Sequence, residues 1–283
     1  MQKSIQIGYD ELFRLKCALA AKAGFRHISV NFTQVLDKTE DEWKAVTDDI
    51  AGILEENGLQ CVQSHPYYYD LRISSEIQEE RYEFAMKQAV IATAKLGGAW
   101  SVFHPRSSIS TGFSVKQSYE DNHRVFSEYL ETAVKHGSGI AVENLPIFPG
   151  LAPSMPFYSS NYEDVIALAD SFHDKHAAVC WDTGHANLMC FDQAEVIRAV
   201  GNRIKCTHIH NNHRKDDDHN PPDNGNIPWN KVMPAFAEIG YDGPLTLETH
   251  CLYPDPMMLE SFAKFNYECL EYLESLTTKE NLP

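Results

Sequence analysis

Positive charge is scarce in this chain. Its 24 lysine and arginine residues face 40 aspartate and glutamate residues, which gives a formal net charge of −16 at pH 7. The longest basic run is the pair Arg214 and Lys215. A protein that binds duplex DNA needs a basic surface to displace the counterions of the phosphates. We therefore expect no nucleic acid partner and a small neutral or phosphorylated substrate instead.

Long apolar runs are missing as well. No run approaches the roughly 20 apolar residues that a membrane-spanning helix needs. The first residues, MQKSIQIGYDELF, contain neither the apolar core nor the cleavage site of a signal peptide. We expect a cytoplasmic protein without membrane contact, and the sequence leaves open whether it is a homo-oligomer.

Motifs for redox centres and nucleotide cofactors are also absent. The chain has no CxxC pair, no P-loop and no GxGxxG, so a nucleotide cofactor has no support. Its seven cysteines are an odd number and are scattered along the chain. We expect buried, reduced thiols and no disulfide framework.

Short apolar runs alternate regularly with amphipathic stretches. The apolar runs predict eight strands, at residues 5–8, 27–31, 59–64, 100–104, 140–143, 178–182, 204–208 and 245–248. Stretches such as 43–54 have the spacing of helices that pack one face on a sheet. Eight such units without a linker predict one α/β domain over residues 1–283, a (β/α)8 TIM barrel. A doubly wound open sheet is the alternative.

Glycines and capping residues mark the ends of the predicted helices. Most strands are preceded by a glycine where a left-handed residue ends the helix, but the connection at 171–176 lacks one. Thr39 and Glu42 have the spacing of a capping box, and Asn161 and Ser118 are further predicted N-terminal caps.

Six consecutive predicted strands end in side chains that can bind a metal. They are His65, His104, Glu143, Asp182 with His185, His208 with His210, and Glu248 with His250. Catalytic groups of a TIM barrel come from the C-terminal ends of its strands, so these side chains should converge at one mouth. Each could be a hydrogen-bonded strand cap, but their coincidence predicts a metal site.

The richest cluster of such residues lies at 204–229, IKCTHIHNNHRKDDDHNPPDNGNIPW. His208 and His210 would point to the same face of a strand, and Asp217 and His219 follow in a loop rich in Pro, Gly and Asn. Imidazole and carboxylate are ligands of Zn, Mn, Fe or Mg. The alternative is a solvated loop with scattered histidines.

Five short motifs together resemble the xylose isomerase-like TIM barrels. They are HP at 104–105, VEN at 142–144, DTGH at 182–185, HIHNN at 208–212 and LE at 247–248. That group includes sugar phosphate isomerases and epimerases, hydroxypyruvate isomerase, inosose dehydratase, tagatose 3-epimerase and endonuclease IV. The resemblance covers nearly the whole chain.

The resemblance to the ketose epimerases implies one divalent metal ion, Mn, Mg, Co or Zn. Its ligands would be Glu143, Asp182, His208 and Glu248. His185 and Arg214 match positions that contact substrate oxygens, and His210 would hold a ligand through its other ring nitrogen.

Endonuclease IV, in contrast, uses three zinc ions. Its extra ligands would fall on His65, His104, His185, Asp217 and His219, so the resemblance leaves the number of ions open. With a single ion, His65, His104 and His210 join the predicted substrate-binding residues, while Asp217 and His219 remain candidates for an additional metal.

The chemistry implied is proton transfer at the carbon next to a sugar carbonyl. A divalent cation stabilises the enediolate that forms, and Glu143 and Glu248 are the predicted acid–base pair. We therefore predict an enzyme that isomerises or epimerises a small sugar, sugar phosphate or polyol. The alternatives are an inosose dehydratase-type lyase, an endonuclease IV-like metal-dependent phosphodiesterase and a non-catalytic sugar-binding barrel.

Overall fold

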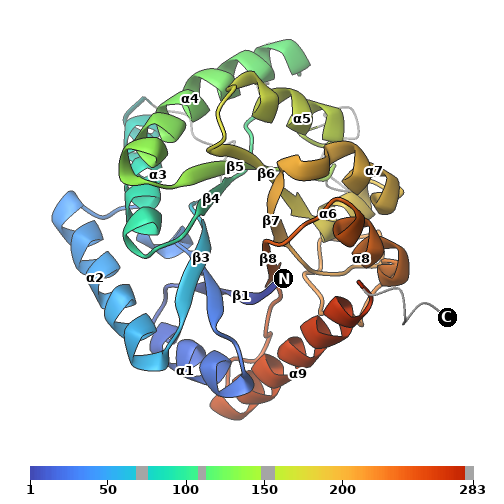
Figure 1. Ribbon diagram of the computed structural model, residues 1–283. Coiled ribbons are helices and arrows are strands. Elements are labelled where there is room, and N and C mark those ends of the chain that lie inside the picture. The colour runs from blue at the N-terminus through green and yellow to red at the C-terminus, as the bar shows by residue number, and fades with distance from the viewer. Residues whose placement is uncertain (68–75, 108–112, 148–156, 278–283) are drawn as a thin grey trace.

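Eight parallel strands form the centre of the molecule in the computed structural model, which describes residues 1–67, 76–107, 113–147 and 157–277 (Figure 1). In chain order they are β1 (Gln2–Gly8), β2 (His27–Asn31), β3 (Gln60–His65), β4 (Trp100–Phe103), β5 (Gly139–Glu143), β6 (Ala177–Asp182), β7 (Ile204–His208) and β8 (Pro244–Leu247). The hydrogen-bonded order runs from β7 down to β1 and then to β8.

The barrel closes between β7 and β8 just beyond the end of β7. Ile209 and Leu247 form a single parallel bridge there. The backbone N–H of Ile209 donates to the carbonyl of Thr246 at 2.7 Å, and that of Glu248 donates to the carbonyl of Ile209 at 3.1 Å. The chain is therefore a (β/α)8 TIM barrel, as predicted, and not an open sheet.

Helices surround the strands as an outer ring (Figure 1). They are α1 (Phe13–Ala23), α2 (Glu40–Asn57), α3 (Glu76–Lys95), α4 (Val115–His136), α5 (Tyr162–Ser171), α6 (Thr183–Leu188), α7 (Gln193–Val200), α8 (Trp229–Glu238) and α9 (Pro256–Ser275), with short 3-10 turns η1 (Thr33–Val35) and η2 (Gly201–Arg203). None of the helices in the described ranges is long and apolar enough to cross a membrane. All seven cysteines are free, and five of them are buried.

The predicted helix signals are largely confirmed. Thr39 and Glu42 form the capping box of α2, and Asn161 caps α5. The prediction for Ser118 was wrong, because Ser114 caps α4 and Ser118 lies in its first turns. In the connection that lacks glycine, His173 takes the positive φ of 50°.

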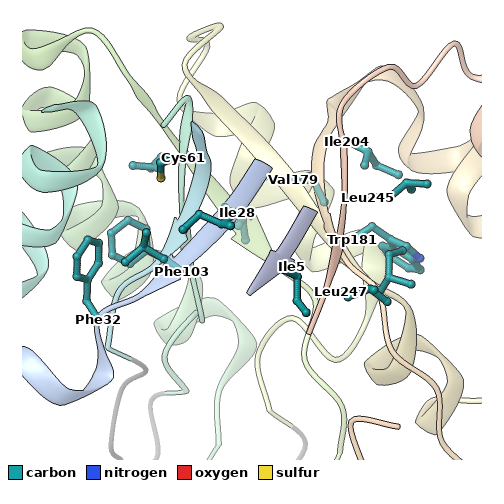
Figure 2. Close-up of a cluster of buried hydrophobic side chains, with 14 of the residues drawn as sticks. Ile5, Ile28, Phe32, Cys61, Phe103, Val179, Trp181, Ile204, Leu245 and Leu247 are labelled. Carbon is teal, nitrogen blue, oxygen red and sulfur yellow. The ribbon is translucent and has the colours of Figure 1, made fainter. Parts of the chain in front are cut away.

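Side chains alternate between the two faces of each strand, as a period of two requires. Those that point outward, such as Val179, Trp181 and Leu247, join the large apolar core between the strands and the helices. Figure 2 shows Trp181 and Leu247 close to Leu245 and Ile204 in this layer.

Inward-pointing side chains on one half of the barrel form a separate small apolar cluster. It contains Val102, Ala141, Ala178, Cys180 and Cys206, all of them buried. Along each of the strands β4 to β7, the next inward position lies two residues further on, at the C-terminal mouth. This cluster therefore forms the floor beneath the mouth.

Candidate active site

A cavity of about 480 Å³ lies at the C-terminal mouth of the barrel. We call it the mouth cavity. Its polar walls include six residues named from the sequence: His65, His104, His185, Asp217, His219 and Glu248. The side chains predicted from separate strand ends therefore converge at one place.

His208 lies between two carboxylates at the base of this mouth. Its Nδ1 is 2.8 Å from Oε1 of Glu143 and 3.2 Å from Oε2 of Glu248. His208 and Glu143 are fully buried. The second oxygen of Glu248 accepts a hydrogen bond of 2.6 Å from Nε2 of Gln6 on β1.

His65 and His104 approach the other oxygen of Glu143. Their Nε2 atoms lie 3.5 Å and 3.1 Å from Oε2 of Glu143 and only 3.2 Å from each other. His65 Nδ1 donates to the carbonyl of Pro66 at 2.6 Å, which fixes its tautomer. The free electron pair of its Nε2 therefore faces His104 and Glu143.

His185 and His219 are anchored in the same way. His185 Nδ1 donates to the carbonyl of Asn144 at 2.8 Å, and His219 Nδ1 donates to that of Glu248 at 2.8 Å. The Nε2 atoms of both rings lie 3.2 Å from Oδ2 of Asp217. A backbone anchor on one ring nitrogen leaves the other available, as in histidines that bind metals.

Asp182 both begins a helix and contributes to the site. Its Oδ1 accepts from the backbone N–H of His185 at 2.6 Å and so caps α6. Its Oδ2 lies 3.0 Å from Nε2 of His210. Asn144, the last residue of the VEN motif, exchanges two hydrogen bonds with the backbone of Asp182.

Gly184 allows the ring of His210 to reach Asp182. A Cβ atom at position 184 would lie 1.9 Å from Cε1 of that ring. Thr183 holds the backbone of His210 from the same side, through bonds of 2.9 Å and 3.2 Å. The DTGH motif therefore combines a helix cap, a close approach and a candidate ligand.

Two groups of candidate ligands share no residue. In one, Glu143, Asp182, His208 and Glu248 each offer an atom within 4.8 Å of the others, and all four are buried. The other consists of His185, His210, Asp217 and His219. His65 and His104 form a third group with Glu143. Imidazole and carboxylate donors in this arrangement could bind divalent metal ions.

Buried polar atoms without a hydrogen-bond partner also indicate a metal site. Among the described residues, His208 Nε2 and Asp217 Oδ1 are buried without a hydrogen-bond partner, and Glu143 Oε2 has only the imidazole nitrogens of His65 and His104 beside it. A buried polar group without a partner is costly, and metal coordination relieves that cost for carboxylate oxygens. The residues present therefore fit a metal site.

Electrostatics in the first group favour a positive ion. Burial alone would raise the pKa of Glu143, but His208 and His104 hold it well below its ordinary value. Burial would lower the pKa of His208, but Glu143 and Glu248 raise it to about 10. The pKa of Glu248 is correspondingly lowered to about 2, against the effect of burial, chiefly by His208.

In the second group, burial and neighbouring charges again shift the pKa values in opposite directions. Burial alone would raise the pKa of Asp217, but His185 and His219 lower it far below its ordinary value. In return, the pKa of His219 rises to about 9 and that of His185 rises well above its ordinary value. Without a metal, protons on imidazoles supply the positive charge that these carboxylates require.

Five of the predicted site residues do not line the mouth cavity: Glu143, Asp182 and His208 lie buried at its base, and His210 and Arg214 lie farther away. His210 is fully buried behind Asp182. Arg214 is exposed, and its Nε donates to Oδ1 of Asn187 at 3.0 Å. Sequence reasoning missed Gln6, whose only signal was a polar residue at an inward position of an apolar strand.

The xylose isomerase-like TIM-barrel family matches residues 17–266 of this chain. The chain belongs to this family. A protein of Methanocaldococcus jannaschii is 30% identical over 136 residues, covering 47% of this chain and 44% of that protein. One of Sinorhizobium fredii is 26% identical over 270 residues, covering 85% and 82%.

Solved structures share the fold over almost the whole chain. A D-tagatose 3-epimerase-like protein has a TM-score of 0.74 at 21% identity, with 98% of this chain and all of that chain covered. D-psicose 3-epimerase of Clostridium cellulolyticum has 0.76 at 15% identity, with 97% and 99% covered. An AP endonuclease of family 2 from Brucella melitensis has 0.69 at 21% identity, with 94% and 99% covered.

Gly184→Ala should disrupt the site because its methyl group would displace His210 from Asp182. We expect a loss of roughly 1–3 kcal/mol in the free energy of unfolding. Metal affinity should fall by about 10- to 100-fold, as when a ligand loses its supporting hydrogen bond. Gly52→Ala on α2 is the matched control, since a Cβ there meets nothing within 4 Å. Unchanged metal affinity in the Gly184 variant would contradict the proposal that Gly184 keeps His210 against Asp182.

Metal binding at pH 7 should release protons. His208 and His219, with pKa values raised to about 10 and about 9, are protonated in the metal-free protein at this pH. A metal binds neutral imidazole, so it must expel these protons. Titration calorimetry in two buffers of different ionisation enthalpy should give different heats, and the release should vanish as pH rises through 9 to 10. Equal heats in both buffers at pH 7 would rule this out.

Proposed function

We propose that this protein is a divalent-metal-dependent isomerase or epimerase of a small sugar or polyol. The observation that carries the proposal is the buried pair Glu143 and Glu248, whose oxygens lie 2.8 Å and 3.2 Å from the same nitrogen, Nδ1 of His208. Asp182 completes this group of candidate ligands. Similarity in fold to ketose 3-epimerases agrees with it.

Glu143, Asp182, His208 and Glu248 would hold the metal, with Mn, Mg, Co or Zn as the candidates. A divalent ion bound there would supply positive charge against the anion that forms when a proton leaves the carbon beside a carbonyl.

Glu143 and Glu248 are the proposed proton carriers. Both have lowered pKa values and are therefore ionised at pH 7, ready to accept a proton. Glu248 is fixed by Gln6, whereas Oε2 of Glu143 faces the Nε2 atoms of His65 and His104. Glu143 and Glu248 would remove and return the proton between them, and Glu248 is the one of the two that lines the mouth cavity.

An isomerase or epimerase and a lyase would use the same pair of carboxylates. A lyase of the inosose dehydratase type would begin with the same proton removal and then expel a β-hydroxyl. His185, with its Nε2 toward the mouth cavity, would contact substrate oxygens in either case. Product analysis by NMR separates an epimer or isomer from a dehydrated product.

A metal-dependent phosphodiesterase is the second candidate function. The observation in its favour is that His185, His210, Asp217 and His219 form a ligand group separate from that of Glu143, beside the contacts of His65 and His104. The net charge of −16 opposes it, because phosphodiester backbones attract cationic surfaces. Incubation with an oligonucleotide that contains an abasic site, at several salt concentrations, tests it directly.

Glu143→Gln should abolish most turnover because an amide cannot accept the proton. We expect the exchange of substrate C–H with solvent deuterium to fall by at least about 100-fold. NMR of the sugar in D2O measures this exchange, and metal analysis of the same sample separates lost chemistry from lost metal. Glu128→Gln on α4, an exposed residue paired with Lys87, is the control. Full exchange in the Glu143 variant with metal bound would refute the assignment.

Protein purified without chelator should contain one metal ion per chain, because the proposed isomerase uses only Glu143, Asp182, His208 and Glu248. The double variant Asp217→Asn, His219→Ala should keep this ion, whereas a protein that binds a second ion at His185, His210, Asp217 and His219 should lose that second ion. His213→Ala is the control, since it lies exposed in the same loop and contacts Asn224. Elemental analysis gives the counts. One ion in both proteins would show that the second group binds none.

A further inference from the structure

A second cavity of about 360 Å³ adjoins the mouth cavity on the side of β1 and β2. We call it the distal cavity. The two cavities share four lining residues, Gln6, Asn31, Glu248 and His250, so they lie side by side. The distal cavity extends from there to Asp10, Thr33 and Gln34.

Most of the polar residues that line this cavity are neutral, among them Asn31, Gln34 and His250. Oδ1 of Asn31 accepts from the backbone N–H of Thr33 at 2.8 Å, which leaves the amide nitrogen of Asn31 for another partner. The ring of His250 stacks on that of His219 with centroids 4.6 Å apart. Amide and imidazole groups together suit the hydroxyls of a sugar.

Anions are disfavoured in the distal cavity. Neither this cavity nor the mouth cavity is lined by a lysine or arginine from the described ranges. The nearby Lys16 is already paired with Asp10, its Nζ 2.5 Å from Oδ2. Asp10 and Glu248 are the charged walls of the distal cavity, and both are acidic. A phosphate group is normally held by arginine, lysine or backbone N–H groups, and it would meet like charge here.

We propose that the distal cavity is a subsite for a neutral, hydroxyl-rich group. The substrate is then a non-phosphorylated disaccharide or glycoside whose reacting sugar lies in the mouth cavity. The cavity volumes are consistent with this proposal, since both fall within the range of about 300–1,000 Å³ for small-molecule sites. This inference depends on the proposed function only in taking the group that reacts in the mouth cavity to be a sugar.

Binding to the metal-loaded protein tests the subsite. The probes are D-fructose, D-fructose 6-phosphate and three disaccharides that carry a second sugar on O3, O4 or O6 of fructose: turanose, lactulose and isomaltulose. Calorimetry should show at least one disaccharide binding about tenfold more tightly than fructose. Fructose 6-phosphate should bind no more tightly than fructose.

Gln34→Leu removes the amide of a residue that lines the distal cavity but not the mouth cavity. We expect a three- to tenfold loss of affinity for the preferred disaccharide, about the value of one hydrogen bond, and unchanged affinity for fructose. Gln117→Leu on α4 is the control, because this exposed amide bonds to Asp121 in its own helix.

The outcomes separate the subsite from the reaction. Equal affinity for fructose and all disaccharides, or tighter binding of the phosphate, would overturn the subsite while fructose turnover still supported the proposed function. A disaccharide whose affinity depends on Gln34, but whose C–H bonds do not exchange, would support the subsite and overturn the reaction. Failure of every disaccharide to bind would overturn the subsite, and the proposed function would then be decided by the deuterium-exchange assay with other sugars and polyols.

Discussion

The two-residue repeat of parallel strands determines where every candidate ligand of the barrel wall lies. Glu143 follows the inward Ala141, Asp182 follows Cys180, and His208 follows Cys206, each by two residues. Small apolar side chains therefore fill the barrel below, and the next inward position on each strand forms the site. A slip of one residue would turn the ligand into the apolar layer against the helices, where an ionised group is costly.

Charge sets the second constraint. Glu143, Asp182, Asp217 and Glu248 are brought together without lysine or arginine in the lining that the structure describes. Burying uncompensated carboxylates costs several kcal/mol each, so positive charge must enter from elsewhere. Protonated imidazoles meet this need in the metal-free protein, and divalent ions would meet it better, because each brings two charges and satisfies several oxygens at once. The same feature makes proton release and metal uptake a single coupled event.

The sequence was sufficient to predict the barrel and the convergence at its mouth, since both follow from strand periodicity and strand order. It did not reveal how Asp217 and His219 reach His185, because this depends on the path of a long loop. Asn211 directs that path by pairing with Asn220 and by donating to the carbonyl of Pro222 at 2.7 Å. Such contacts between side chain and backbone have no periodic signature. Gln6 was not predicted for a related reason. Its hydrogen bond to Glu248 forms only because β1 lies beside β8.

The site divides into a charged centre and a neutral extension, and this division matters for catalysis. The centre holds acidic groups whose interactions change as a proton moves, which is where stabilisation of the transition state is useful. The distal cavity would contact a part of the substrate that does not react. Binding energy from such a remote part can offset the loss of freedom when the reacting carbon is held between Glu143 and Glu248. A substrate that fills both cavities would therefore gain in turnover as well as in affinity, whereas a monosaccharide would lack that contribution.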